Sequence, residues 1–459
     1  MNYEEYRKRK LVCHVPTGFD IDPKELNEHL MDWQRLVVRW GVYKGRCAFF
    51  TDTGTGKTPM GLAWSDAIHK RTGKNILAYA PLAVSHQTVR EGLKFGIKVT
   101  RCNSQADVHP GINITNYERM ENFDHSKFGG VWLDESGRIK NESSVFRIGI
   151  IQKCQDVPFK LCTSATPSPN DYPELGNTSE FLGVASMSEM KSMYFINDSG
   201  DTTAAWRLKG HVQDNKFWEF LSEWCVMIRR PSDIGFTDDG YILPKLQMHE
   251  HIIPAENNTG WFLDMAEGLR EVEDSMRETM EDRCRKIAEI VNASDEIWAV
   301  WCHRNPEGKL LSKLIKDSVE VHGTMDDDLK VKHFLDFADN KIKCLITKPK
   351  IAMYGMNWQN CHNIAVTGLS HSFEAFYQLC RRFHRFGQKY PVKVHIVIGE
   401  REGSVLETIK RKEKQMITMY GAMIKHMADL TNQELRQSVR RTTPYNPAVE
   451  MELPKFLEE

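Results

Sequence analysis

The chain has 459 residues and a formal net charge of −1 at pH 7, with 61 Lys and Arg against 62 Asp and Glu. This balance excludes a histone-like polycation, and the 41% of hydrophobic residues excludes a disordered chain. No apolar run approaches the ~20 residues of a membrane span, the N-terminus shows no secretory signal, and the 11 cysteines form no CxxC pair. We therefore expect a soluble intracellular protein with several domains.

The first segment, residues 1–168, alternates short apolar runs with longer amphipathic stretches. Short apolar runs separated by helical spacers predict a parallel sheet flanked by helices, that is, an α/β domain. The expected strands lie at 46–50, 75–80, 130–133 and 160–162.

The regularity is lost over residues 169–255, where Pro, Gly, Asn and Asp punctuate aromatic patches, and we expect an insertion and a linker there. Residues 256–425 resume the α/β pattern and predict a second domain of similar size, followed by a C-terminal tail at 426–459. Within the second domain, the pattern predicts one long helix over 261–291 and strands at 297–301, 319–322, 343–346, 363–366 and 392–397.

A glycine-rich loop follows the first expected strand and precedes an expected helix. The backbone N–H groups of such a loop surround phosphate oxygens, and the helix N-terminus adds partial positive charge. Lys57 is expected to reach the terminal phosphates and the Thr58 hydroxyl to bind Mg²⁺. The pattern predicts a nucleoside triphosphate site. The cradle comprises Thr53, Gly54, Thr55, Gly56, Lys57 and Thr58, with Thr51 where such loops usually begin with Gly or Ala.

Two adjacent acids, Asp134 and Glu135, end the expected strand at 130–133. In P-loop ATPases the first such acid holds Mg²⁺ and the second polarises the attacking water. Adjacent acids at a strand end are common on protein surfaces, so this assignment depends on the phosphate loop upstream. With that loop present, we expect Asp134 to be a metal ligand and Glu135 to be catalytic.

Three residues of the second domain, Gln378, Arg382 and Arg385, have the spacing that places side chains on one face of a helix. Guanidinium groups suit bidentate contact with a γ-phosphate and stabilise transition-state charge. The alternatives are a solvated basic face or a patch that touches only nucleic acid. Because a triphosphate site requires a charge-neutralising partner, we expect these three residues to be catalytic and to fold back onto the phosphate loop.

The run from Gln378 to Gln388 resembles the Swi/Snf motif Gln-x-x-x-Arg-x-His-Arg-x-Gly-Gln at every fixed position. The octet 134–141 resembles the family's Asp-Glu-Ala-His-Arg-(Ile/Leu)-Lys-Asn, with Ser and Gly in place of Ala and His. The segment 163–167 resembles the Ser-Ala-Thr motif of superfamily two helicases, and the blocks follow the family's order. The chain thus resembles the compact Swi/Snf-like ATPases of bacterial and phage genomes.

This resemblance implies two RecA-like lobes that bind ATP and Mg²⁺ between them, with Gln34 reading the adenine. It implies that Ser164, Ala165 and Thr166 couple the state of the nucleotide to lobe movement. It also implies a nucleic-acid partner, most of all double-stranded DNA, and no membrane. The residues at matching positions for nucleic-acid contact are Pro81, Asn116, His303, Thr347 and Lys348.

A basic stripe at 376–415, with ten Lys or Arg against four Asp or Glu, is compatible with phosphate-backbone contact. Trp358 lies in a segment that departs from a nucleic-acid-binding motif of the family. Its side chain either contacts nucleic acid or is buried in the core. The leading expectation is a cytoplasmic, DNA-stimulated ATPase that translocates on DNA, in a bacterium or a phage-infected cell. Two alternatives stay open: a strand-separating DNA or RNA helicase, and a nucleic-acid-binding scaffold subunit switched by ATP.

Overall fold

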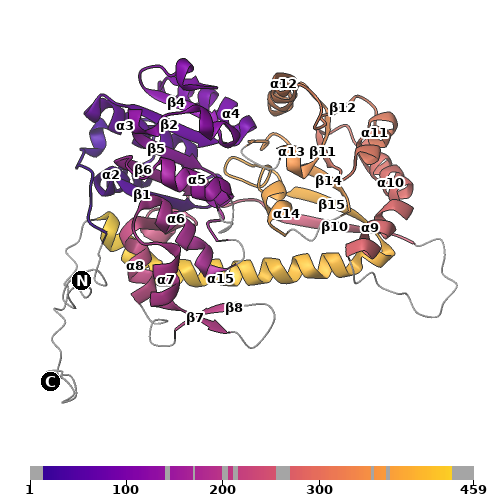
Figure 1. Ribbon diagram of the computed structural model, residues 1–459. Helices are drawn as coiled ribbons and strands as arrows, with labels where there is room; N and C mark the ends of the chain where they lie inside the picture. The colour runs from indigo at the N-terminus through magenta and orange to yellow at the C-terminus, as the bar shows by residue number, and fades with distance from the viewer. Residues whose placement is uncertain are drawn as a thin grey trace, which may run out of the picture.

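The computed structural model describes residues 14–139, 145–168, 171–198, 205–209, 216–254, 269–352, 356–368 and 373–436. Several expected features therefore lie outside the described residues: the end of the acidic octet at 140–141, residues 353–355, and the tail from 437 onward. The described chain forms two parallel sheets, each flanked by helices, and one long helix that runs beneath both (Figure 1). The expected mixed α/β architecture with mainly parallel sheets is confirmed.

The first sheet has seven strands in the order β3-β4-β2-β5-β6-β1-β9, all paired in parallel. Successive side chains of a strand point to opposite faces, and Phe49 and Phe50 accordingly pack into two different hydrophobic cores. The strands are β1 Arg46–Thr51, β2 Asn75–Ala80, β3 Val99–Arg101, β4 Ile112–Asn116, β5 Phe128–Asp134, β6 Phe159–Ser164 and β9 Cys225–Ile228. The helices around them are α2 Asp32–Lys44, α3 Lys57–Thr72, α4 Leu82–Lys94 and α5 Val145–Lys153.

The second sheet has six strands in the order β10-β15-β14-β11-β13-β12, again all parallel. Trp358, whose place was open between core and nucleic-acid contact, is fully buried in this domain's core. The strands are β10 Leu246–Ile253, β11 Trp298–Trp301, β12 Ser318–Glu320, β13 Cys344–Thr347, β14 Asn363–Thr367 and β15 Val392–Gly399. The helices are α9 Leu269–Glu278, α10 Met280–Asn292, α11 Asn305–Leu314, α12 Asp327–Ala338, α13 Pro349–Ala352 and α14 Phe373–Cys380.

The single helix expected over 261–291 is, in its described part, two helices, α9 and α10, that meet at Thr279. At this junction the Thr279 hydroxyl donates to the carbonyl of Ser275 and accepts from Arg283 Nε, while the Thr279 N–H still donates to Ser275 and the Thr279 carbonyl accepts from Arg283. The one-stripe apolar pattern continues across this break, which is why the sequence predicts one helix.

The range 169–255 does more than insert and link, because it supplies one strand to each sheet. Strand β9 pairs with β1 in the first sheet, and β10 pairs with β15 in the second. The range also forms a small helical lobe with an antiparallel hairpin, which packs against the first sheet (Figure 1). Its elements are α6 Leu175–Leu182, α7 Met187–Tyr194, β7 Phe195–Asp198, β8 Ala205–Leu208 and α8 Lys216–Trp224.

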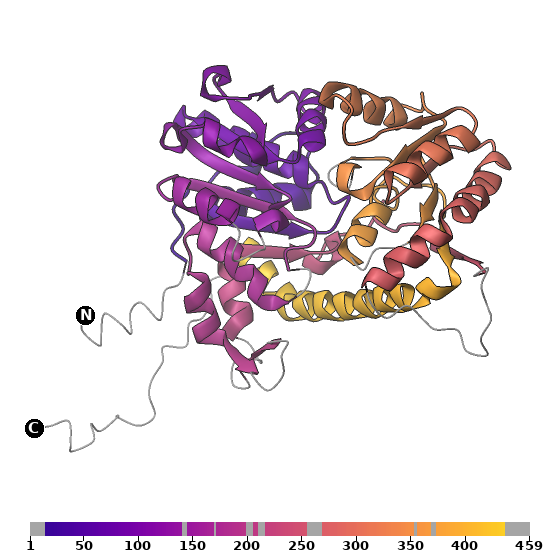
Figure 2. The same cartoon turned by 45° about the vertical axis from the view of Figure 1, so that its right-hand side comes forward.

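Helix α15, Gly403–Leu435, starts beside the second sheet and ends in the core of the first (Figure 2). Met423 and Met427 are fully buried in a first-sheet core, and Lys44 Nζ lies 2.9 Å from Glu434 Oε2. The helix therefore continues through the tail boundary expected at 426 and ties both sheets together.

Short 3₁₀ helices complete the described fold. They are η1 Pro23–Glu25, η2 Gln105–Asp107, η3 Tyr117–Asn122, η4 His125–Lys127, η5 Ser136–Ile139, η6 Tyr172–Glu174, η7 Pro231–Ile234 and η8 Glu400–Glu402. Among the helices of the described residues, none combines the length and the apolar character that crossing a membrane demands.

Candidate functional site

The loop between β1 and α3 closes around a lysine. Gly54 and Gly56 have φ angles of 81° and 87°, in the left-handed region that favours glycine. Lys57 Nζ donates to the carbonyls of Thr51 and Asp52, each at 3.0 Å. Burial lowers the pKa of Lys57, while Glu135 and Asp52 oppose the shift. Backbone carbonyls at the start of the loop thus hold the ammonium group in place.

Thr51, where such loops usually begin with Gly or Ala, has a defined role in this loop. Its hydroxyl accepts a hydrogen bond from the Thr55 hydroxyl at 2.7 Å, and its side chain is buried. The departure from the usual residue therefore adds a bond that braces the loop.

Gln34, expected to read adenine, bonds to the backbone of the phosphate loop in this structure. Its Nε2 donates to the carbonyl of Thr55 at 2.8 Å, and its Oε1 accepts from the N–H of Met31 at 3.0 Å. A Cβ on Gly56 would lie 2.3 Å from that Nε2, so the close approach requires glycine. Both ends of the Gln34 amide are engaged by backbone groups, and the residue does not line the cleft described below.

The two acids lie at the carboxyl end of β5. Asp134 is 4% exposed, and its Oδ1 accepts from Thr163 Oγ1 at 2.7 Å and from the Glu135 N–H at 3.1 Å. Burial, together with the neighbouring Glu135, raises the pKa of Asp134 to about 7. Glu135 has a φ of 54°, which is unusual for a residue with a side chain and marks a functional site in many proteins.

The expected helix face of Gln378, Arg382 and Arg385 requires a correction, because α14 ends at Cys380. Beyond it, a backbone hydrogen bond spans three residues instead of four: the Arg382 N–H donates to the carbonyl of Leu379 at 3.2 Å. Arg382 and Arg385 therefore lie in the turns after the helix, which we call the arginine turn, residues 381–387. Their Nη1 atoms donate to the same carbonyl, that of Met356, at 3.3 and 3.5 Å.

A cleft of about 390 Å³ lies between the two sheets and brings the two groups of residues together. Burial lowers the pKa of Arg385, and the acids Glu91 and Glu135 oppose this shift. The cleft thus places positive side chains of the second domain opposite the phosphate loop of the first domain. Its lining residues include, from the first domain, Thr53, Gly54, Gly56, Lys57, Thr58, Asp134 and Glu135 and, from the second domain, Gln378, Arg382 and Arg385.

The segment expected to couple the two domains touches the second of them. Gln378 Nε2 donates to Thr166 Oγ1 across the cleft at 3.2 Å. The Thr166 N–H in turn donates to Ser164 Oγ at 3.1 Å, and Ala165 between them is buried. These bonds join α14 of the second domain to the turn that follows β6 of the first.

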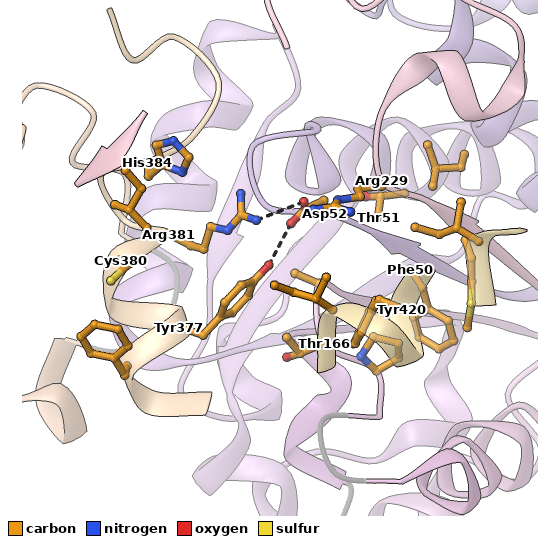
Figure 3. Close-up of a pocket in the computed structure, with 18 of the residues that line it drawn as sticks. Phe50, Thr51, Asp52, Thr166, Arg229, Tyr377, Cys380, Arg381, His384 and Tyr420 are labelled. Atoms are coloured by element: carbon orange, nitrogen blue, oxygen red, sulfur yellow. Dashed lines mark hydrogen bonds and ion pairs between the residues drawn. The ribbon is translucent and has the colours of Figure 1, made fainter. Parts of the chain in front are cut away.

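Contacts that the sequence did not predict also join the two domains. Asp52 of the phosphate loop lies 3.5 Å from the Arg381 guanidinium and accepts from the Tyr377 hydroxyl at 3.4 Å (Figure 3). A Cβ on Gly54 would lie 2.7 Å from the backbone nitrogen of Phe386. No local pattern signals these contacts, because each joins residues more than three hundred positions apart.

The residues expected to contact nucleic acid do not all share one surface. Pro81 and Asn116 line a groove of about 320 Å³ together with residues of α12 and α13. Thr347 is 2% exposed, and its hydroxyl donates to the carbonyl of Val321 at 3.0 Å. The remaining two, His303 and Lys348, bond to the carbonyl of Gly368 and to the side chain of Asn305 respectively, and they lie outside the groove.

The donor set of the cleft fits a magnesium ion. Thr58 and Asp134 both line the cleft, and hydroxyl and carboxylate oxygens are the ligands that Mg²⁺ prefers. In the described part of the chain, no group of three or more His, Cys, Asp and Glu is arranged to hold a metal ion. In proteins Mg²⁺ beside phosphates is commonly bound by one or two protein groups plus the substrate.

Comparisons with known proteins add no relative to this description. No protein-family model matches the chain, and no curated protein matches its sequence. The proposals below rest on the motifs and the geometry of the chain itself.

Proposed function

We propose that this protein is an ATP-driven nucleic-acid motor of the Swi/Snf-like type, with two RecA-like lobes that hydrolyse ATP in the cleft between them. The observation that carries the proposal is the shared cleft: Lys57 and Glu135 line it together with Arg382 and Arg385. Hydrolysis of a triphosphate requires cationic groups around the transferred phosphoryl group and an acid that orients water, and both kinds of group meet here.

Six residues of the cleft have a role in this reaction. Lys57 binds the terminal phosphates, and Glu135 orients and polarises the attacking water. Arg382 and Arg385 stabilise the charge that develops in the transition state. Thr58 and Asp134 would hold Mg²⁺, which when bound neutralises phosphate charge and lowers the pKa of Asp134.

Hydrolysis drives movement in this proposal because the two walls of the cleft belong to different lobes. ATP attracts the arginine turn toward the phosphate loop, and loss of the γ-phosphate removes that attraction. Gln378 and Thr166, bonded across the cleft, transmit the change to the first lobe. The groove at Pro81 and Asn116, which both lobes line, is the proposed place of the DNA backbone.

The test is an ATPase assay with single-stranded DNA, duplex DNA and duplex RNA, each at several salt concentrations. We expect Mg²⁺-dependent turnover that duplex DNA stimulates and that rising salt weakens. Glu135→Gln is expected to lower kcat by ~10³-fold while binding of a non-hydrolysable ATP analogue persists. Absence of ATP hydrolysis with every nucleic acid would overturn the proposal.

The same preparation separates the open alternatives. Strand displacement on DNA or RNA duplexes would identify a helicase that separates strands. Slow turnover that no nucleic acid changes, with binding altered by the ATP analogue, would identify the scaffold. In the proposed motor, duplex DNA raises turnover and the strands stay paired.

A further inference from the structure

Asp52 joins the phosphate loop to the segment that carries the catalytic arginines. Its Oδ2 lies 3.5 Å from Arg381 Nη2, and its Oδ1 accepts from the Tyr377 hydroxyl at 3.4 Å. We call these two contacts the Asp52 bridge. Figure 3 shows the Arg381 and Tyr377 side chains, which belong to the second domain, pointing toward Asp52 of the first.

Both ends of the Asp52 bridge are directly connected to residues of the proposed reaction. On one side, the carbonyl of Asp52 itself accepts from Lys57 Nζ at 3.0 Å. On the other side, Tyr377 and Arg381 are the immediate neighbours of Gln378 and Arg382 along the chain. A change in the bridge therefore changes the distance between the lysine and the arginine turn.

The surroundings of the Asp52 bridge make it costly to break. The side chains of Asp52 and Arg381 are 16% and 17% exposed, and they border a mostly apolar cavity of about 150 Å³ (Figure 3). In such surroundings an ion pair is stronger than in water, and a charge that loses its partner is destabilised. The cavity wall includes Phe50, Met227, Met248, Phe376, Ile417 and Ile424.

Other charged groups near Asp52 do not replace Arg381. Burial lowers the pKa of Arg381, but Asp52 and then Tyr377 outweigh this effect and raise it, so the guanidinium stays charged. Lys57 Nζ faces the carbonyl of Asp52, and Arg229, on the same cavity wall, is exposed. Arg381 is thus the guanidinium that meets the Asp52 carboxylate at the border of this cavity.

We propose that Asp52 is a positioning residue, which through Arg381 and Tyr377 holds the arginine turn at the distance from the phosphate loop that hydrolysis requires. This inference rests on the proposed function and deepens it. Asp52 itself touches neither the phosphates nor the water in this proposal. Asp52 contributes by raising the fraction of time that the two walls of the cleft spend in the productive arrangement.

The test is a double-mutant cycle on the full chain with Asp52→Asn, Arg381→Gln and the double variant. We expect each single substitution to lower kcat by ~10-fold and the double variant to cost little more, because the two residues act through one contact. Affinity for a non-hydrolysable ATP analogue, measured by calorimetry, is expected to stay within ~3-fold, because phosphate-binding groups are retained. A residue with only a structural role would not produce this split between kcat and affinity.

Two further variants keep the test decisive. Tyr377→Phe removes one hydroxyl, is expected to fold, and should lower kcat by ~3-fold. Arg229→Gln removes an exposed guanidinium from the same cavity wall and should leave kcat unchanged. Additive effects in the cycle, equal losses of kcat and affinity, or a rise in kcat would each overturn the inference while wild-type hydrolysis leaves the proposed function intact. A wild-type chain that hydrolyses no ATP would overturn both.

Discussion

The two walls of the cleft are held in place by different means. On the first wall, short bonds fix each group before any ligand arrives: Lys57 donates to the carbonyl of Thr51, and Asp134 accepts from Thr163. These partners belong to the same sheet and lie within one loop or on adjacent strands. This wall is preorganised, so substitutions on it are expected to change ligand binding or the stability of the loop.

On the second wall, the catalytic arginines lie after the end of a helix. Arg382 and Arg385 share one carbonyl acceptor, that of Met356, at 3.3 and 3.5 Å. Further contacts of the segment cross the cleft, among them Gln378 to Thr166. Since the position of this wall depends on the opposite wall, substitutions on it are expected to change the rate of hydrolysis more than the binding of ATP.

The largest effect on this comparison is expected from Arg385→Ala, which removes a cation that lines the cleft. We expect kcat to fall by ~10²–10³-fold, because transition-state charge loses a donor, while affinity for an ATP analogue falls far less. Steady-state kinetics and calorimetry measure the two quantities. The control is Arg285→Ala, at an exposed arginine on α10. Parallel losses of rate and affinity would show that the two walls do not differ as described.

A smaller effect is expected from Gln378→Ala, which removes the bond to Thr166. We expect kcat to fall by ~10-fold, the value of one hydrogen bond lost in the reacting arrangement, with DNA stimulation reduced. Thr166→Val removes the same bond from the first wall, and the double variant should resemble either single one. If the losses of kcat caused by the two substitutions are additive, the bond does not couple the walls.

The sequence predicts the first wall better than the second for a physical reason. Its residues follow directly after buried strands, and the carboxyl ends of parallel strands meet at one edge, so short motifs locate them. The Asp52 bridge has no such signal, because an acid in a loop and an arginine in a turn come into contact only when the chain folds. The helix expected to reach Arg385 ends at Cys380, because the carbonyl of Arg382 accepts from Trp358 instead of continuing the helix.

The same reasoning explains why strands β9 and β10 were not predicted. Strand β9, Cys225–Ile228, is a short buried run within an irregular range, and short apolar runs carry little signal of their own. Strand β10, Leu246–Ile253, has two histidines and a glutamate and lies at the edge of its sheet, where polar side chains are tolerated. Both strands depend on a neighbour distant in sequence, β1 for the first and β15 for the second.

The smallest effect is expected from Gln34→Ala, behind the first wall. The substitution leaves the Met31 N–H and the Thr55 carbonyl without their side-chain partner. We expect the free energy of unfolding to fall by about 2 kcal/mol, as measured by denaturant titration. The KM for ATP should rise ~3-fold through a looser loop, with kcat nearly unchanged.

The control for this last variant is Gln152→Ala, at an exposed position of α5. The preference for ATP over GTP decides between the two roles considered for Gln34. If the residue only braces the loop, the binding of ATP and the binding of GTP weaken equally, because neither base contacts it. A selective loss of ATP would show that the amide exchanges its backbone partners for adenine when nucleotide binds, and that the first wall is less preorganised than its bonds indicate.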